Sequence, residues 1–425
     1  MSGRDKAFHL MVGLLLVLGY FASTPAHIWQ PDNAVLVPPE AGQAAPRPGQ
    51  PWTLRAASDA ITPLVHAASM VELPDGRLRA FWFAGRREGG PDVGIHSAVF
   101  DPASGQWSPE QRLFDRHRVA QRFGYTIRKL GNALPVMSAD GRMRLFVVAV
   151  SFGGWAASRL VVAESADLGE SWVFTDDLVL SPFLDLSYLV KTPPVRYSDG
   201  TIGLPVYHEF AGKFGELLRL TPDNRIIDRY RIGHGRAAIQ PLVLVRDDQR
   251  AVAFLRNETR DRAGRVFFSA SEDAGRSWTP LEVSEVPGPS AALGGISLGP
   301  DHWLLGANFN AYERDELHVV ESRDAGASWQ LIRTLADRET HRLKPLQPEA
   351  FRELLAQELK QFVGIADPAT VLNRAAMQKC TPMGCEFQYD YPFVLRTRNG
   401  DIHVLYTWNK SLIAHAYWQA GGEAQ

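Results

Sequence analysis

The chain has 425 residues, of which 45% are hydrophobic and 22% are charged, and this composition excludes a protein that is disordered over its whole length. Its 45 basic and 47 acidic residues give a formal net charge of -2, so the overall charge points neither to nucleic acid nor to an anionic membrane surface as a partner. Selectivity for a ligand therefore has to come from a local site.

The N-terminal segment, residues 1–26, has the pattern of an export signal. Arg4 and Lys6 precede an apolar run over residues 7–22, which small residues follow. The run is shorter than the roughly 20 residues that a full membrane span prefers, and Pro25 lies close to the expected cleavage position. A cleaved signal peptide and a retained anchor therefore both stay open. Either reading predicts a periplasmic or extracellular protein, and the second adds anchoring to the inner membrane.

Residues 27–51 follow as a proline-rich segment. Six prolines lie between Pro31 and Pro51, with almost no aromatic residues, so the segment is expected to form an extended linker without packed structure. The folded domain is then expected to cover residues 52–425.

A short polar turn between two apolar, β-rich runs recurs six times along this domain. Asp-Gly between such runs is a strong signal for a β-hairpin. The six turns are Asp75-Gly76, Asp140-Gly141, Asp199-Gly200, Asp247 to Gln249, Pro300-Asp301 and Asn399-Gly400.

A second motif, S-x-D-x-G-x-x-W, occurs three times, at residues 165–172, 271–278 and 322–329, and residues 101–107 look like a degenerate fourth copy. The Asp carboxylate can accept backbone N–H bonds, Gly can supply a positive φ, and Trp can pack against the sheet. We therefore expect a structural turn motif whose aspartates are not catalytic.

Together the two repeats predict an all-β fold, a six-bladed β-propeller. One turn between the first two strands and another between the last two is typical of a four-stranded blade. A β-sandwich, the alternative, would not require the second motif to recur at a similar offset from the first.

The longest gap between turns, at about residues 333–386, predicts an insertion between blades five and six. Residues 348–362 carry apolar side chains at helical spacing. This short helical insertion either roofs the central funnel or packs against the side of the ring. Cys380 and Cys385 could close a small loop as a disulfide, and as metal ligands two cysteines are a weak set.

Counting back nine or ten residues from each turn locates the residues that open the inner strands and face the centre of the ring. They are His66, Asn132, Lys191, Gln240, a stretch of small residues around Ala292, and Tyr391. Counting forward along the second strands gives Arg86, Glu88, His208, Glu209, Arg256 and Trp408, among others. Arginines, carboxylates, amides and aromatic rings in one concavity suit a carbohydrate ligand. No cofactor and no metal is implied.

On these motifs the chain, from about residue 55 onward, resembles the sialidase (neuraminidase) superfamily, and most closely its bacterial predicted-neuraminidase group with BNR-type Asp-box repeats. The resemblance implies an Asp acid/base at Asp92, a Tyr nucleophile at Tyr391, and arginines that clamp the substrate carboxylate at Arg256 and Arg314. Arg314 lies eight residues before Ser322.

Three positions depart from the pattern that the resemblance implies. His66 stands where the first clamp arginine is expected, and Thr407 stands where the Glu that supports this arginine is expected. Gln240 stands where a Glu would assist the Tyr nucleophile, and an amide cannot take its proton. Another group, with His208, Glu209 and Glu258 as the candidates, would then have to activate Tyr391.

The expected function is a sialidase-like exo-glycosidase that hydrolyses a terminal acidic sugar with retention, using Tyr391 as nucleophile and Asp92 as acid/base. Two alternatives stay open, a non-catalytic glycan-binding propeller and a polysaccharide lyase on the same scaffold. All three have a glycan or polysaccharide as the partner.

Overall fold

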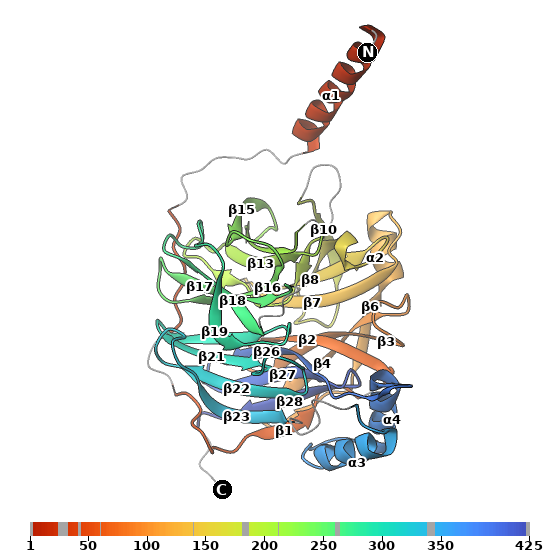
Figure 1. Cartoon of the computed structure of the whole chain (residues 1–425), viewed down its shortest axis with the longest axis vertical. Coiled ribbons are helices and arrows are strands. Elements are labelled where there is room, and N and C mark those ends of the chain that lie inside the picture. The colour runs from red at the N-terminus through yellow and green to blue at the C-terminus, as the bar shows by residue number, and fades with distance from the viewer. Residues whose placement is uncertain are drawn as a thin grey trace.

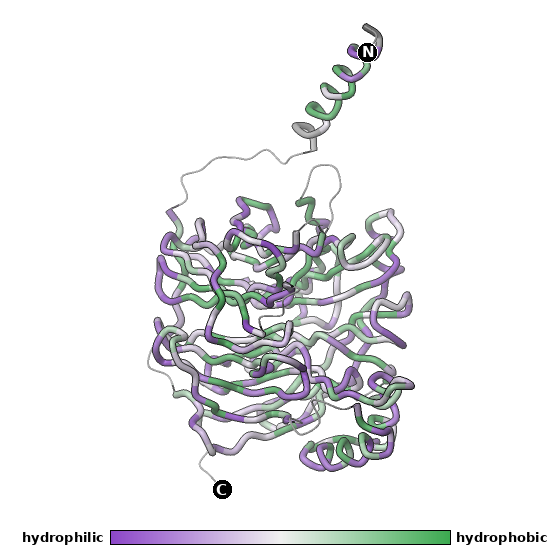
Figure 2. The backbone as a smooth tube through the Cα atoms, in the orientation of Figure 1, coloured by the Kyte–Doolittle hydropathy of each residue, from purple (hydrophilic) through white to green (hydrophobic). Residues whose placement is uncertain are grey.

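The computed structural model describes residues 3–23, 33–40, 44–59, 61–138, 140–180, 187–210, 212–259, 264–337 and 345–421. Six β-sheets surround a common centre (Figure 1), which confirms the predicted six-bladed propeller. The apolar residues follow the strands inside the ring, whereas the outer loops are mainly hydrophilic (Figure 2). Each blade therefore buries its faces against its neighbours.

The first three blades form the first half of the ring. From the inner strand outward they are β2 (Leu64–Glu72), β3 (Leu78–Gly85), β4 (Gly94–Asp101) with β5 (Gln106–Trp107) and β6 (Gln111–Asp115); β7 (Lys129–Met137), β8 (Met143–Val150), β9 (Ser158–Ser165) and β10 (Val173–Leu178); and β11 (Leu189–Val190) with β12 (Val195–Arg196), β13 (Ile202–His208), β14 (Phe214–Leu220) and β15 (Ile226–Ile232). A short helix, α2 (Arg116–Phe123), follows β6, and its first backbone N–H groups donate to the side chain of Asp115.

The other three blades complete the ring. They are β16 (Ala238–Val245), β17 (Ala251–Asn257), β18 (Arg265–Ser271) and β19 (Glu282–Pro287); β20 (Gly294–Gly299), β21 (His302–Ala307), β22 (Glu316–Ser322) and β23 (Gln330–Asp337); and β26 (Tyr389–Arg396), β27 (Ile402–Trp408), β28 (Leu412–Trp418) and β1 (Thr53–Ala56). The outer strand of the sixth blade thus comes from the start of the folded domain, where Thr53 pairs with Tyr417 and Ala56 pairs with Ala414. This pairing closes the ring.

Each predicted turn lies where the repeats place it. The six polar turns join the first and second strands, and the S-x-D-x-G-x-x-W motifs join the third and fourth strands. In the second motif the Asp273 carboxylate accepts from Ser277 N (2.8 Å) and Ser271 Oγ (2.9 Å), while Trp278 Nε1 donates to Gly275 O (2.9 Å). These bonds form within the turn itself, as a structural role requires.

The insertion contains two helices, α3 (Pro348–Leu359) and α4 (Pro368–Lys379), followed by a small hairpin of β24 (Cys380–Thr381) and β25 (Gly384–Cys385). The apolar face of α3 packs into the same hydrophobic cluster as Tyr406 and Trp408 of the sixth blade. Cys380 and Cys385 form a disulfide across the hairpin. The sequence pattern predicted the first helix and missed α4.

One part of the proline-rich segment packs against the ring, which corrects the expectation of an unpacked linker. Leu36 has only 1% of its surface exposed, and its N–H donates to Asp248 O (2.8 Å). Arg276 Nη2 donates to Ala34 O (2.6 Å). Ala34, Val35 and Leu36 lie against the face that carries the hairpin turns, and Leu36 is buried there.

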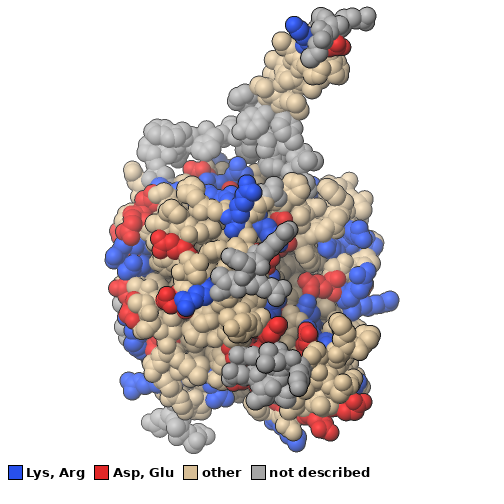
Figure 3. All heavy atoms as spheres, in the orientation of Figure 1, with Lys and Arg blue, Asp and Glu red and all other residues tan. Residues whose placement is uncertain are grey.

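The N-terminal helix α1 (Gly3–Ser23) leaves its apolar side chains exposed, with Leu10 at 76%. In the described part of the chain, none of the helices has both the length and the apolar character that a membrane crossing needs. Export and anchoring therefore stay predictions. Charges of both signs are scattered over the face of the molecule in Figure 3, in keeping with the small net charge.

Candidate active site

The inner strands carry their site residues at β-bulges. The pairing of β26 with β27 shifts between Asp390 and Phe393, around Tyr391, and that of β16 with β17 shifts between Ile239 and Leu242, around Gln240. Tyr391 and Gln240 both have left-handed backbone conformations, with φ of 53° and 54°. A bulge re-aims a side chain, and such strain is retained mainly at functional positions.

Similar shifts occur in the first two blades, directly after His66 and around Asn132. The positions found by counting back from the turns therefore lie at or next to the places where four inner strands depart from regular pairing.

A small central cavity of about 30 Å³ lies among the first, second, third and sixth blades. It is lined by His66, Phe83, Glu88, Asn132, Val148, Trp155, Leu189, Tyr207, Glu209 and Tyr391. Its volume fits a water molecule rather than a sugar ring, so a larger ligand has to lie across its mouth.

The hydroxyl group of Tyr391 accepts a hydrogen bond from Gln240. The amide Nε2 of Gln240 donates to Tyr391 Oη (2.8 Å) and to Tyr207 Oη (3.3 Å), while its Oε1 accepts from Arg256 Nη1 (3.4 Å). Because a guanidinium can only donate, Arg256 fixes the orientation of this amide. Burial raises the pKa of Tyr391, and Arg256 opposes that rise. The hydroxyl proton of Tyr391 therefore needs an acceptor other than Gln240.

Two carboxylates, whose pKa values are shifted in opposite directions, line the central cavity beside Tyr391. Burial raises the pKa of Glu209, and no ion pair of its carboxylate occurs among the described residues. Burial also disfavours the charged form of Glu88, but His66 and an ion pair with Lys410 outweigh it and hold the pKa of Glu88 low. Glu209 is therefore the more readily protonated of the two carboxylates and the better candidate for proton exchange with Tyr391.

His66 and Thr407 contact each other at the position where the family resemblance implies an arginine–glutamate pair. His66 Nδ1 lies 3.1 Å from Thr407 Oγ1, and the His66 ring centroid lies 4.5 Å from that of Tyr391. Burial, followed by the charge of Lys410, lowers the pKa of His66 to about 4. His66 is therefore uncharged at neutral pH and supplies no positive charge to a substrate.

Lys191 lies beside Tyr391, outside both cavities. Its Nζ donates to Pro392 O (2.9 Å) and lies 5.7 Å from the centre of the Tyr391 ring. The lysine is buried, with 5% of its surface exposed, and burial lowers its pKa to about 7. Lys191 thus supports Tyr391 and does not line the cavity.

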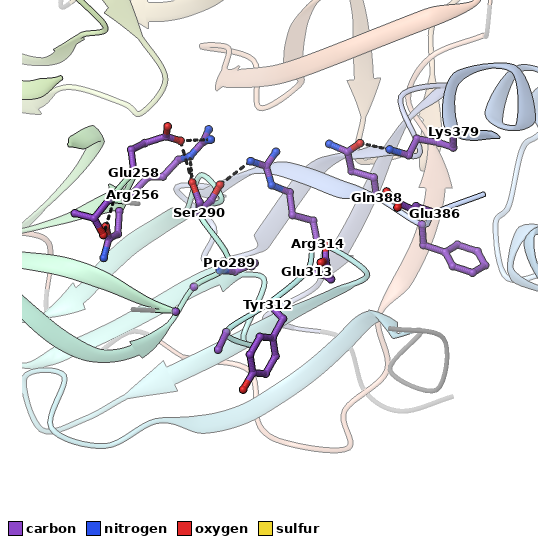
Figure 4. A pocket seen from close by; sticks show the side chains of 16 residues that line it. Arg256, Glu258, Pro289, Ser290, Tyr312, Glu313, Arg314, Lys379, Glu386 and Gln388 are labelled. Atoms are coloured by element: carbon purple, nitrogen blue, oxygen red, sulfur yellow. Dashed lines mark hydrogen bonds and ion pairs between the residues drawn. The ribbon is translucent and has the colours of Figure 1, made fainter. Parts of the chain in front are cut away.

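A second, larger cavity of about 530 Å³ lies among the fourth, fifth and sixth blades and the end of the insertion, a size typical of small-ligand sites. Both expected clamp arginines line it (Figure 4). Arg256 pairs with Glu258, and Arg314 Nη1 pairs with Asp390 Oδ1 (3.0 Å). Since Gln240 contacts both Arg256 and Tyr391, the two cavities adjoin through this amide.

Six expected site residues line neither cavity, namely Lys191 and Gln240, described above, and His208, Trp408, Arg86 and Asp92. His208 turns away because side chains alternate along a strand, so Tyr207 and Glu209 face inward while His208 Nε2 contacts Glu216 Oε2 (2.8 Å). Trp408 is fully buried and packs against Phe362 of the insertion.

Arg86 and Asp92 are the other two. Both are exposed on the loop after β3, where Asp92 Oδ2 accepts from Arg86 N (2.7 Å). The same loop carries Glu88, which does line the central cavity.

Several residues that reach the site were not predicted from the sequence. They are Trp155, Tyr207, Asp390, Lys410, and, from the insertion and the segment that follows it, Lys379 and Gln388. Strand alternation from Glu209 would have found Tyr207. Lys410 lies two residues beyond Trp408, in a turn where Asn409 and Lys410 both have left-handed φ, and counting along a regular strand does not anticipate such a turn. No sequence signal marks Lys379.

The ring of six blades and its Asp-box turns define a six-bladed β-propeller with BNR-type repeats. Residues 76–404 match the model of the BNR repeat-like domain family, and the chain belongs to that family. No curated protein matches the chain in sequence.

Solved structures share the fold at low sequence identity. The Hadza microbial sialidase Hz136 is 13% identical with a TM-score of 0.58, over 86% of this chain and 67% of that one. A protein of unknown function from Dyadobacter fermentans is 12% identical with a TM-score of 0.58, over 87% and 97%. The NanB sialidase from Streptococcus pneumoniae is 10% identical with a TM-score of 0.55, over 86% and 70%. At such identities the likeness shows the fold alone.

Proposed function

We propose that the protein is a sialidase-like exo-glycosidase that hydrolyses a terminal acidic sugar with retention of configuration. The observation that carries this proposal is the link through Gln240, which joins Tyr391, beside two carboxylates, to Arg256 in the arginine-lined cavity. A sugar carboxylate on Arg256 and Arg314 would place the anomeric carbon towards Tyr391.

In the first step Tyr391 Oη bonds to the anomeric carbon as the glycosidic C–O bond breaks. Glu209 takes the phenol proton, and Asp92, the residue that the family resemblance assigns, gives a proton to the leaving oxygen. The donor amide of Gln240 stabilises negative charge on Tyr391 Oη. In the second step Asp92 takes a proton from water, water displaces the tyrosine, and Glu209 returns its proton to Tyr391.

The test is hydrolysis of a panel of acidic and neutral aryl glycosides. We expect the wild type to cleave an acidic glycoside and to release the sugar first with its original anomeric configuration, as followed by NMR. Tyr391→Phe should reduce kcat to background with little change in binding, and Glu209→Gln should reduce it about 100-fold or more. Tyr125→Phe, in a residue that lines neither cavity, is the matched control.

One observation favours a second candidate, a glycan-binding propeller without turnover. Gln240 cannot take a proton from Tyr391, and His66 is uncharged at neutral pH. Glycan affinity that survives in Tyr391→Phe, with no hydrolysis by the wild type, would favour this candidate. An unsaturated product that absorbs in the ultraviolet would favour a lyase instead.

A further inference from the structure

The larger cavity contains a lysine that has no acidic partner. Lys379, the last residue of α4, lines the cavity together with Arg256 and Arg314. Its Nζ donates to the amide oxygen of Gln388, and among the described residues no carboxylate lies within 4.0 Å of it. Figure 4 shows Lys379 and Gln388 at one end of the cavity and Arg256 at the other, with Arg314 between them.

Both arginines of this cavity, by contrast, already have carboxylate partners. Glu258 contacts Arg256 and also accepts from Lys213 Nζ (3.1 Å), and Asp390, which is buried, contacts Arg314. The two remaining acidic residues of the cavity wall, Glu313 and Glu386, are exposed. Of the three cations that the described cavity wall contains, Lys379 is therefore the one that forms no ion pair with a carboxylate.

The insertion holds Lys379 in a defined place. Tyr389 Oη donates to Glu358 Oε2 (2.8 Å), and Gln378 Nε2 donates to Arg86 O (3.3 Å), so both helices are bonded to the ring. The disulfide between Cys380 and Cys385 begins at the next residue. An ammonium held in this way loses little side-chain entropy on binding a ligand.

The residues around the centre of the ring supply little net positive charge to an acidic ligand. Arg256 and Arg314 are each paired with a carboxylate, and His66, where the family resemblance implies another arginine, is uncharged at neutral pH. The available positive charge in the adjoining cavity comes from the insertion.

We propose that Lys379 binds the substrate's acidic group and, with Arg256 and Arg314, selects carboxylated sugars. This inference rests on the proposed function and names a specificity residue that lies outside the propeller blades. The third cation of the site then comes from the insertion between the fifth and sixth blades.

The experiment compares each of two acids, N-acetylneuraminic acid and glucuronic acid, with its own methyl ester, by calorimetric titration. The ester keeps the ring and removes the charge, so the ratio of the two affinities isolates recognition of the carboxylate. The proteins are the wild type, Lys379→Gln, Lys379→Arg and the control Lys360→Gln, which changes an exposed lysine of the same insertion.

We expect at least one acid to bind the wild type better than its ester. Lys379→Gln should weaken binding of that acid at least tenfold and leave the ester unchanged, whereas Lys379→Arg and Lys360→Gln should keep the preference. Equal thermal unfolding midpoints would show that Lys379→Gln is folded.

Three results would overturn the inference. Lys379→Gln could bind the acid as tightly as the wild type, it could lose acid and ester equally, or neither acid could bind the wild type. In the first two cases hydrolysis of acidic glycosides by the wild type would still support the proposed function. In the third case, absence of that hydrolysis would remove the proposed function as well.

Discussion

Lys191 is a buried cation beside Tyr391, and we expect its replacement by methionine to stabilise the protein. Its ammonium has one described acceptor, Pro392 O, and its surroundings include the rings of Tyr391 and Phe393. Methionine has a similar length and removes the charge.

The magnitude follows from the pKa of Lys191, which burial lowers from the ordinary 10.5 to about 7. Above pH 10.5 both the folded and the unfolded chain are neutral at this position, and the lysine costs nothing. As the pH falls from 10.5 to 7, only the unfolded chain takes up the proton, so the free energy of unfolding decreases. Below pH 7 the cost is constant at about 5 kcal/mol.

The substitution also removes the bond to Pro392 O, which is worth about 1–3 kcal/mol. We therefore expect a net gain of roughly 2–4 kcal/mol at pH 7, which raises Tm by roughly 2–5 °C for a domain of this size.

The assay is urea and thermal unfolding of the wild type, Lys191→Met and the exposed-lysine control Lys360→Met at pH 6.5, 8 and 9.5. The advantage of Lys191→Met should be largest at pH 6.5 and should shrink as the pH rises, while the control shows no such trend. A Lys191→Met protein that is no more stable than the wild type at pH 6.5, or whose advantage does not change with pH, would refute the reasoning.

Three further predictions follow from other parts of the ring. Asp273→Ala removes the acceptor of the second Asp-box turn and should lower the free energy of unfolding by about 1–3 kcal/mol, without changing glycan affinity, because this turn packs on residue 249 at the opposite end of the blade from Gln240. Removal of residues 1–50 should leave a folded ring, whereas removal of residues 1–57 also deletes β1 and should give an aggregated protein on size-exclusion chromatography. Burial lowers the pKa of His66 to about 4, so only the unfolded chain takes up a proton at this position as the pH falls from 6.5 to 4. His66→Gln should therefore reduce the acid-induced loss of stability by up to about 3 kcal/mol, as measured by urea unfolding.

The fold could be predicted because its information is local. Each blade is marked in the sequence by a turn of a few residues, and the chain alternates between such turns and β-rich runs. Counting back from the turns also found Tyr391 and Gln240, since each lies nine residues before the last residue of its turn, Gly400 and Gln249. The burial of Leu36 was missed because proline content describes the local chain and not the surface it meets.

The site could be predicted only in part, because counting along a strand gives a position and not a direction. His208 and Glu209 were equally good candidates until the alternation of side chains in β13 separated them. Trp408 was placed in the site, but the chain continues two residues further, and Lys410 reaches it.

The position of Lys379 in the site depends on how a helical insertion packs against two blades. That packing brings together residues that are far apart in the sequence. The ion pairs at the larger cavity likewise come from three blades, the fourth for Arg256 and Glu258 and the fifth and sixth for Arg314 and Asp390. Patterns within single strands carry no information about such combinations.

The pairing of β1 with β28 has a consequence for the timing of synthesis. Thr53 pairs with Tyr417, so the first strand of the domain has no partner until roughly 360 further residues have been made. At about 5–20 residues per second, a growing chain exposes that unpaired edge for tens of seconds. The ring can close only after the ribosome has finished almost the whole chain, and during this interval β1 is open to pairing with another molecule.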